Sequence, residues 1–501
     1  MTEGSGGIGR RMAKGAAWMV AVRLIDRSIG LVSTVILARL LVPADFGVVA
    51  LAVSVIAVLE IWAEFGFDLA LIRDQKAERR HYDTAWTLMV LRGLIVAAAI
   101  SASAGQMALF FDEPRIESVL YALALMSLIE GCQSIRVVDF RKNLEMHREF
   151  RFLMTARVVQ FIATIVFAYL WRDFWALVVG ILANRGTRLV LSYWMAPYLP
   201  RLTLSAFSEL FGFSKWVVVN SLLNFVTTRL DTFVIGRISG VSSLGIYSMA
   251  YEISNLATTE LVWPISRALF PGFSRIADHP EELARTYNLS LSVIVLAALP
   301  VTAGIALTAD YFVPIVLGNK WLAAIPIMQV LALYGGLRVI IANTGSLYLA
   351  VNKPFLISIM AAANLAILAP AMVWLIQLYG PIGAAWAVVA GSLPMIVLMF
   401  VFNQIHVGIR FSETLLFLVR PLCACALMIA GLLALRDLLP PSSEFFENLW
   451  RLLVLVAVGA ALYVAAIAVT WRLMRHQLGA EPIVWALVRD RVRAVRLRRT
   501  P

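Results

Sequence analysis

The sequence predicts an all-α polytopic membrane protein with about 14 transmembrane helices, arranged as two related six-helix bundles and two further helices. Apolar residues make up 61% of the 501 residues, charged residues make up only 15%, and the mean hydropathy is +0.82. Soluble domains are typically about 45–50% apolar. In addition, apolar runs recur along the whole chain, and its first half resembles its second half. Composition, span length and internal repetition therefore predict the same class.

Apolar runs of about 20 residues, the length that crosses a bilayer as a helix, follow one another with short polar loops between them. In the first half, the expected spans are 16–40, 46–71, 84–109, 116–138, 152–170 and 174–198. In the second half, they are 212–236, 244–270, 286–309, 322–349, 355–378 and 382–402. Two more spans are expected at 414–435 and 449–471.

The two halves match in a definite register. Residues 37–49 realign without a gap on residues 235–247, which pairs Arg39 with Arg237 and Gly47 with Gly245. Since six helices return the chain to its starting side, the halves would share one topology about an axis along the membrane normal, as in many transporters. The predicted domains are a bundle at 1–200, a bundle at 201–405, and a helix pair with a basic tail at 406–501.

Lysine and arginine are distributed unequally between the loops on the two sides of these spans. One side holds 25 of them and the other side holds 5. Cytosolic loops carry this excess, so both termini are predicted to be cytosolic. The net charge of +12 thus reflects membrane topology rather than nucleic-acid binding.

Charged residues also occur inside the spans, where a charge at the bilayer centre costs on the order of 3 kcal/mol. Thirteen arginines and no lysine lie inside or at the ends of the spans, namely Arg23, Arg27, Arg39, Arg92, Arg136, Arg157, Arg185, Arg188, Arg229, Arg267, Arg338, Arg420 and Arg451. In the first span, Arg23, Asp26 and Arg27 share one helix face. Because guanidinium groups bind phosphate oxygens in a bidentate manner, this face is a candidate phosphate site.

The second span carries an acidic stripe, with Glu60, Glu64 and Asp68 spaced every four residues. These carboxylates come to membrane depths similar to those of Arg23 and Arg27. Salt bridges between the first two helices are therefore an alternative to a phosphate site. The two interpretations are compatible if a bridge breaks when substrate arrives.

The second half offers weaker counterparts to the arginine face. Arg229 and Asp231 in the seventh span, Arg267 in the eighth and Arg338 in the tenth are the further candidates for substrate binding. The spacing of Arg229 and Asp231 places them on different helix faces.

Signatures of enzymes are absent from the sequence. It contains no phosphate-binding glycine loop and no zinc-ligand spacing, and the loops are too short to hold a soluble catalytic domain. We therefore expect a transporter without catalytic residues, metal or cofactor, although coupling to H⁺ or Na⁺ stays open.

Several motifs resemble a known family. These are LARLLVPADFGVVALAVSV, the matched IGRISGVSSLGIYSMAYEISN, PISRALFPGFSRI, GNKWLAAIPIMQVLALYGGLRVI and NTGSLYLAVNKP. Together they resemble the polysaccharide-transport branch of the multidrug/oligosaccharidyl-lipid/polysaccharide exporter (MOP) superfamily, and more narrowly Wzx-type oligosaccharide flippases. The resemblance covers residues 15–410 and implies two six-helix bundles facing each other in a V, with two peripheral helices, working by alternating access.

The resemblance also implies a cargo and a place in the cell. The cargo would be an oligosaccharide repeat unit on undecaprenyl pyrophosphate, moved across the bacterial inner membrane for exopolysaccharide, capsule or O-antigen (lipopolysaccharide) synthesis. Membrane lipids and polysaccharide polymerase machinery would be its partners. Arg23, Asp26, Arg27, Arg229 and Asp231 would act in the cavity, and the matched Arg39 and Arg237 would belong to the outer gate.

Other functions stay open at this point. A lipid II flippase would bind a similar polyprenyl pyrophosphate sugar. A cation-coupled multidrug exporter of the same superfamily would need a net acidic cavity, which the arginines disfavour. A membrane glycosyltransferase or polymerase would be expected to show a large periplasmic loop or a carboxylate-rich soluble face.

Overall fold

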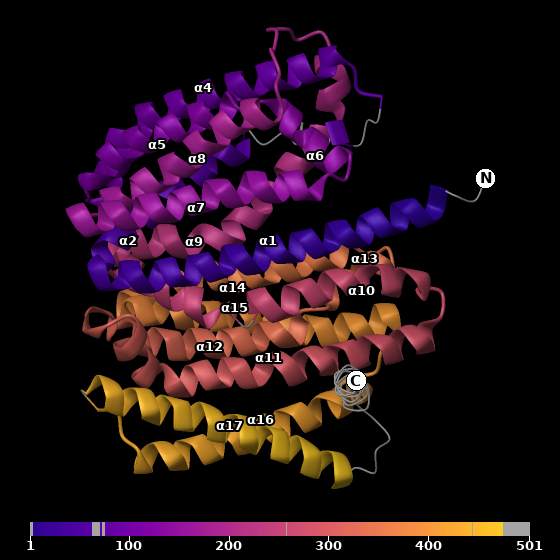
Figure 1. Cartoon of the computed structure of the whole chain (residues 1–501). Helices are drawn as coiled ribbons and strands as arrows, with labels where there is room; N and C mark the ends of the chain where they lie inside the picture. Colours follow the sequence, from indigo (N-terminus) through magenta and orange to yellow (C-terminus); the bar gives the residue numbers. More distant parts are fainter. Residues whose placement is uncertain (1–3, 63–70, 73–75, 257, 443, 474–501) are drawn as a thin grey trace, which may run out of the picture. The chain divides into compact units, whose positions relative to one another are not determined.

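The computed structural model describes the chain except for residues 1–3, 63–70, 73–75, 257, 443 and 474–501 (Figure 1). The described residues contain helices and no strand. They divide into two compact units, Met1–Ile246 and Tyr247–Pro501. The all-α class predicted from the sequence is therefore confirmed.

The helices of the first unit pack as hairpins: α4 contacts α5, and α7 contacts both α8 and α1. The elements are α1 (Gly4–Leu40), α2 (Pro43–Trp62), α4 (Arg79–Phe111), α5 (Arg115–Gly131), the 3₁₀ turn η1 (Ile135–Val137), α6 (Val138–Lys142), α7 (Met146–Trp171) and α8 (Trp175–Met195). Helix α9 (Phe207–Ser254) begins in the first unit and ends in the second.

The second unit contains the remaining helices and two short π-helices. Its elements are η2 (Thr258–Val262, π), α10 (Trp263–Arg275), α11 (Pro280–Val316), η3 (Asn319–Trp321), α12 (Ala324–Ile341), α13 (Thr344–Ala350), α14 (Phe355–Tyr379), α15 (Pro381–Phe402), η4 (Asn403–Val407, π), α16 (Phe411–Leu438) and α17 (Phe445–Leu473).

The internal repeat is visible in the helices. The break between α1 and α2 at Val42 has its counterpart 198 positions later, where α9 is interrupted at Gly240 with φ 79°. Glycine adopts this positive φ without steric strain. The contacts α4–α5, α7–α8 and α5–α8 of the first unit recur as α11–α12, α14–α15 and α12–α15 in the second. Each unit therefore contains the same pairing of helices.

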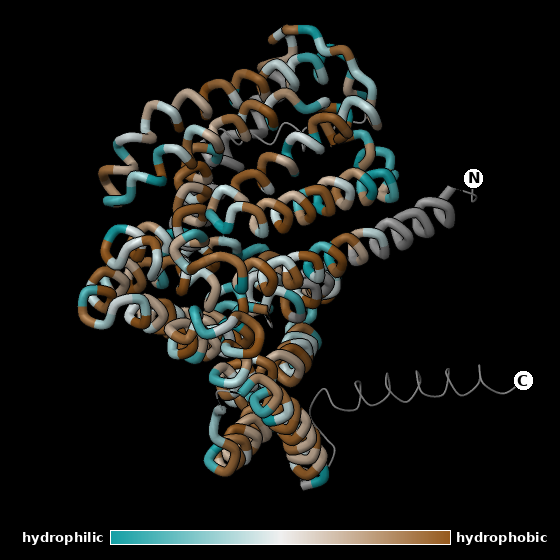
Figure 2. The backbone as a smooth tube through the Cα atoms, turned by 60° about the vertical axis from the view of Figure 1, so that its left-hand side comes forward, coloured by the Kyte–Doolittle hydropathy of each residue, from teal (hydrophilic) through white to brown (hydrophobic). Residues whose placement is uncertain are grey.

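Ten described helices are long and apolar enough to cross a membrane, or eleven if the bent pair of α5 with η1 and α6 is one span. Figure 2 shows apolar residues along most of the helices. Helices α1 and α8 are not among the ten, although they have 37 and 21 residues. Polar residues lower their hydropathy, namely Arg23, Asp26 and Arg27 in α1 and Asn184, Arg185 and Arg188 in α8. The multi-pass membrane class is confirmed, whereas the exact number of spans is not.

Glycine residues bring neighbouring helices into close contact. A Cβ at Gly93 of α4 would lie 2.6 Å from the carbonyl oxygen of Ser127, and one at Gly131 of α5 would lie 2.7 Å from that of Met89. Small residues at such positions allow membrane helices to pack tightly.

The matched glycines of the repeat face each other where α2 crosses α9. A Cβ at Gly47 would lie 1.8 Å from the carbonyl oxygen of Val241, and a Cβ at Gly245 would lie 1.8 Å from that of Pro43. Val241 and Pro43 are themselves 198 positions apart, so the contact is reciprocal between repeat-related residues. Only glycine fits on either side of this crossing.

The predicted domain boundaries near residues 200 and 405 stay predictions. The two compact units divide inside α9, at Ile246, and this division does not test where one six-helix bundle ends.

Candidate functional site

A polar cavity of about 510 Å³ lies inside the first unit, between α1, α2, α5, α7 and α8. Its volume falls in the range of about 300–1,000 Å³ typical of ligand pockets. Its polar lining residues are Arg23, Asp26, Glu60, Arg157, Gln160, Asn184, Arg185 and Arg188. We call it the arginine cavity.

Positive charge is in excess in this cavity. Four arginines line it against two carboxylates, those of Asp26 and Glu60. Charges within a membrane protein normally pair with one another or face water. The arginine cavity therefore favours an anion that carries about two negative charges.

Arg157 of α7 is held by α1. Its Nε lies 2.9 Å from Oδ1 of Asp26, and its Nη1 donates a hydrogen bond of 3.1 Å to Oε1 of Gln160. One turn beyond Asp26, a Cβ at Gly30 would lie 3.1 Å from Nη2 of Arg157. Asp26 and Gly30 thus give α1 a face that accepts the α7 guanidinium.

The two arginines of α8 differ in their partners. Arg185 Nη1 lies 3.1 Å from Oε2 of Glu130 on α5. Arg188 is half-buried, and its charge interacts with those of Arg185, Glu130, Asp26 and Arg157. Its Nε has no hydrogen-bond partner in the part of the chain that the structure describes. Arg188 therefore has donor capacity left for a ligand.

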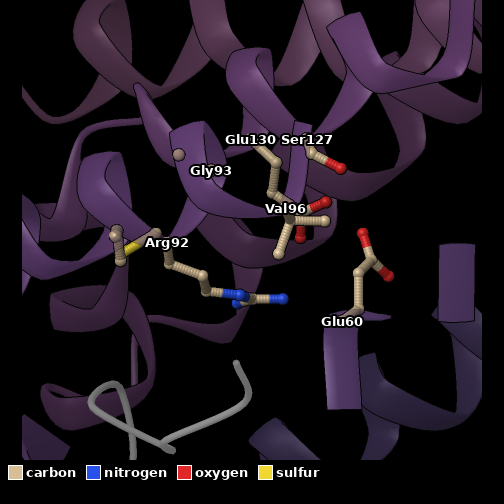
Figure 3. A pocket seen from close by; sticks show the side chains of 8 residues that line it. Glu60, Arg92, Gly93, Val96, Ser127 and Glu130 are labelled. Carbon is tan, nitrogen blue, oxygen red and sulfur yellow. The ribbon is translucent and has the colours of Figure 1, made fainter. Parts of the chain in front are cut away.

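A second, smaller pocket adjoins the arginine cavity and shares Glu60 with it. In Figure 3, the guanidinium of Arg92 extends toward the Glu60 carboxylate, and the Glu130 carboxylate lies near them. The pocket measures about 10 Å³, which is room for about one water molecule. Glu60 therefore lines both pockets, and Glu130 lines the smaller pocket while it pairs with Arg185 of the larger cavity.

The structure brings together three of the residues predicted from the first two spans. Arg23, Asp26 and Glu60 line the arginine cavity, whereas Arg27 of α1 is not among its lining residues. Asp26 pairs with Arg157, so this ion pair joins α1 to α7 rather than α1 to α2. Glu64 and Asp68 lie outside the described residues.

The predicted outer-gate arginines are both exposed. Arg39 lies near the end of α1, and the guanidinium of Arg237 on α9 lies 5.6 Å from the ring centroid of Phe110 on α4. Their role in gating stays a prediction.

The candidates from the second half fall in different units, with Arg229 and Asp231 in the first and Arg267 and Arg338 in the second. Arg229 is exposed on α9, and Asp231 accepts a 2.7 Å hydrogen bond from the backbone N–H of Thr232. In the second unit, the Arg338 guanidinium lies 5.6 Å from the ring centroid of Tyr334. Arg267 falls on α10, but its side chain lies outside the described residues.

Sequence reasoning did not select the α5, α7 and α8 residues of the site. The polar side chains concerned are Glu130, Arg157, Gln160, Asn184, Arg185 and Arg188. A signal was present, since Asn184, Arg185 and Arg188 form a polar group near the middle of an apolar span. The sequence did not show that α7 packs on α1, which is what joins Arg157 to Asp26.

Residues 36–326, more than half of the chain, match the family described as polysaccharide biosynthesis protein. The chain belongs to the polysaccharide biosynthesis protein family. It is 28% identical over 341 residues to lipopolysaccharide biosynthesis protein WzxC of Escherichia coli (strain K12), covering 67% of this chain and 69% of that protein.

Two further relatives come from other bacteria. Teichuronic acid biosynthesis protein TuaB of Bacillus subtilis (strain 168) is 24% identical, with 69% of this chain and 72% of the relative aligned. Succinoglycan biosynthesis transport protein ExoT of Rhizobium meliloti (strain 1021) is also 24% identical, with 66% and 67% aligned. These names confirm the predicted resemblance to the polysaccharide-transport branch, and the name of ExoT agrees with a transporter.

Solved structures show the same fold. Lipid II flippase MurJ, in an inward closed conformation, superposes with a TM-score of 0.73 at 12% identity, covering 92% of this chain and all (100%) of that one. An inward-facing multidrug resistance MATE family transporter of the MOP superfamily superposes with a TM-score of 0.61 at 14% identity, covering 76% and 94%. This member of the polysaccharide biosynthesis protein family therefore has the fold expected for the superfamily.

Proposed function

We propose that this member of the polysaccharide biosynthesis protein family is a flippase. It moves oligosaccharide repeat units linked to undecaprenyl pyrophosphate across the bacterial inner membrane by alternating access, for exopolysaccharide, capsule or O-antigen synthesis. The observation that carries this proposal is the arginine cavity, an anion-attracting site among the membrane helices of a chain that belongs to this family.

The charge of the cavity suits the diphosphate of such a cargo. A diphosphate that links a lipid to a sugar carries two negative charges, and the cavity has two more arginines than carboxylates. Arginine offers planar, bidentate donors to phosphate oxygens, and lysine does not. The cavity accordingly contains arginine and no lysine among its lining residues.

The ion pairs of the cavity provide a way to bind and to release the cargo. In the structure, Asp26 pairs with Arg157 and Glu130 pairs with Arg185. Phosphate oxygens would replace these carboxylates, so each arginine would keep an anionic partner in both states. Arg188, whose Nε is not engaged by a described residue, would make the first contact.

The orientation in the membrane belongs to the same proposal. One set of loops carries 25 lysines and arginines, and the opposite set carries 5. This difference supports cytosolic termini and entry of the cargo from the cytosol. Membrane lipids and the polysaccharide polymerase machinery would be the partners on the delivery side.

Lipid II transport is the second candidate. The fold is shared with lipid II flippase MurJ, and lipid II presents the same polyprenyl diphosphate chemistry to the arginine cavity. A multidrug exporter is less well supported, because a cavity with excess arginine repels lipophilic cations.

Reconstitution of the purified chain in liposomes tests the proposal. Undecaprenyl-pyrophosphate oligosaccharide is placed in one leaflet, and its arrival in the other is read by oxidation of the sugar with a membrane-impermeant reagent. We expect protein-dependent translocation of the oligosaccharide lipid. Translocation of lipid II alone would favour the second candidate, and movement of neither lipid would contradict both.

The same liposomes test the coupling ion. An imposed H⁺ gradient and an imposed Na⁺ gradient are compared with no gradient. A rate that responds to one gradient identifies the ion, and an unchanged rate identifies downstream consumption of the cargo as the driving force.

A further inference from the structure

Arg92 is a charged residue in the middle of a membrane helix. It lies about 20 Å along α4 from the start of that helix at Arg79. Its side chain is half-buried, and none of the ion pairs formed by the described residues includes it. Charges within membrane helices normally pair with one another or face water. Arg92 therefore has the capacity to bind a carboxylate.

The small pocket beside Arg92 contains a second donor for a carboxylate (Figure 3). Ser127 of α5 lines this pocket and is only 5% exposed. Its Oγ has no hydrogen-bond partner in the part of the chain that the structure describes. Ser127 precedes Glu130 by three residues, so the two side chains share one face of α5. The pocket thus offers a guanidinium and a hydroxyl to the Glu130 carboxylate.

Glu130 is only loosely held by its present partner. Its Oε2 lies 3.1 Å from Nη1 of Arg185, but this oxygen accepts no hydrogen bond from a described residue. Ion pairs with well-aligned hydrogen bonds are the strong ones. Glu130 also lines the small pocket. A change of its side-chain rotamer can therefore turn the carboxylate from Arg185 toward Arg92.

The packing of α4 on α5 keeps Arg92 and Glu130 close to each other. Each is followed by a glycine, and these two glycines lie where the helix backbones touch. A Cβ at Gly93 would lie 2.6 Å from the carbonyl oxygen of Ser127, and one at Gly131 would lie 3.3 Å from the Cα of Val90. Because the backbones are already in contact, Glu130 can change partners without a movement of either helix.

We propose that Arg92 receives the Glu130 carboxylate when a phosphate oxygen of the cargo replaces it at Arg185. This inference rests on the proposed function, because it takes a diphosphate as the ligand of the arginine cavity. The pocket has room for about one water molecule, which is enough for one carboxylate oxygen. Arg92 is a positioning residue, since it does not line the arginine cavity itself.

This exchange removes a penalty on cargo binding. A displaced carboxylate without a partner would remain as a negative charge beside the diphosphate and would repel it. With Arg92 as its second partner, Glu130 stays paired both before and after the cargo binds. Glu60 lines the same pocket, and the five donors of a guanidinium can serve both carboxylates. Arg92 thus raises the affinity for the cargo without touching it.

Calorimetric titration of the purified full-length chain with inorganic pyrophosphate tests this role. Arg92→Gln should weaken pyrophosphate binding by about fivefold or more, because Glu130 then has no second partner. Arg92→Lys, which keeps the charge, should bind within about twofold of the wild type. Arg172→Gln is the control for the loss of one positive charge, because Arg172 is exposed at the end of α7, and it should bind like the wild type.

A double-mutant cycle separates this role from a general attraction of anions. Glu130→Gln removes the charge that has to move. In that background, Arg92→Gln should change the pyrophosphate affinity by less than about twofold. An arginine that attracted anions by its charge alone would lose the same factor in both backgrounds.

The outcomes distinguish this inference from the proposed function. Equal affinity of wild type and Arg92→Gln, or the same loss in both backgrounds, would overturn the role of Arg92 and leave the flippase proposal standing. If the wild type did not bind pyrophosphate, the anion site and this inference would both be wrong. Coupling between Arg92 and Glu130 in a chain whose liposomes move no oligosaccharide lipid would support the role of Arg92 and contradict the proposed cargo.

Discussion

At the scale of single residues, the arginines of the cavity fall into two classes. Arg157 and Arg185 each have a carboxylate partner, whereas the Nε of Arg188 has none among the described residues. Removing Arg157 or Arg185 leaves a carboxylate without its partner, but removing Arg188 does not. Substitutions in the two classes should therefore differ in their effect on the stability of the protein, whereas all of them should lower transport.

Arg188→Gln should lower the rate of cargo translocation in liposomes at least tenfold. The thermal unfolding temperature should stay the same or rise, because a half-buried cation whose Nε lacks a hydrogen-bond partner among the described residues has been removed. Arg172→Gln is the matched control, since Arg172 is exposed at the end of α7 and away from the cavity. Wild-type translocation by a well-folded Arg188→Gln protein would remove this residue from the site.

Asp26→Asn should have the opposite effect on anion binding. Losing this carboxylate releases Arg157 and raises the excess positive charge of the cavity, so inorganic pyrophosphate should bind severalfold more tightly in calorimetry. The loss of stability should be less than about 1 kcal/mol, because the Asp26 side chain is half exposed (51%). Weaker pyrophosphate binding by Asp26→Asn would contradict the assignment of the cavity as an anion site.

Part of this site was predictable from the residues. The spacing of Arg23 and Asp26 placed them on one polar face of the first helix, and both line the cavity. The partners of that face were not predictable, because the packing of α1 on α7 is a property of the tertiary structure. Periodicity shows that a face is polar but does not show which helix it meets.

At the scale of helices, the reciprocal glycine contact between α2 and α9 leaves no room for a side chain on either helix. Gly47→Ala should destabilise the protein by about 1–3 kcal/mol, the usual effect of overpacking. The new methyl would overlap the carbonyl oxygen of Val241 unless the helices move apart. Unfolding of the purified protein by heat, with wild type alongside, measures the change.

Gly304→Ala provides the control for this prediction. A Cβ at Gly304 on α11 has no heavy atom within 4 Å, so alanine should be tolerated and should gain helix propensity. If Gly47→Ala is as stable as Gly304→Ala, the close crossing of α2 and α9 is wrong.

Helix positions were largely predictable, and helix ends less so. The expected spans at 355–378 and 382–402 agree closely with α14 and α15. The seventh and eighth spans were expected to be separated by a short gap, but α9 covers the seventh, runs into the eighth as far as Ser254, and is interrupted at Gly240. A single glycine with positive φ can end one helix and begin the next without the polar loop that marks a boundary in the sequence.

At the scale of the whole molecule, the predicted topology can be tested by labelling single cysteines. Cys132, Cys423 and Cys425 are replaced by serine, and one cysteine is introduced at a time. Trp171→Cys, at the end of α7, should react with a membrane-impermeant maleimide in intact spheroplasts. Asn143→Cys, in the exposed loop after α6, should react only after lysis. The reverse pattern of labelling would show that the chain has the opposite orientation in the membrane.

The class of the molecule was predictable because hydropathy and the positive-inside bias act along the whole chain. The family was predictable from sequence motifs. Most of them lie within residues 36–326, which match the family, and the others follow that range. The number of spans was harder to predict, since the helices that line a polar cavity must carry polar residues and so lose the hydropathy by which spans are recognised. Helices α1 and α8 are the two that show this conflict.

The location of the lipid-linked sugars in cells that lack this chain tests the proposed flippase most directly. The chain is depleted in its native host, and polyprenyl-pyrophosphate oligosaccharides in sealed spheroplasts are labelled with a membrane-impermeant reagent before extraction. We predict that complete repeat units accumulate out of reach of the reagent, on the cytosolic face, and that wild-type protein restores their export while Arg188→Gln does not. Normal surface polysaccharide with no accumulation, or complete units already exposed on the outer face, would contradict the account.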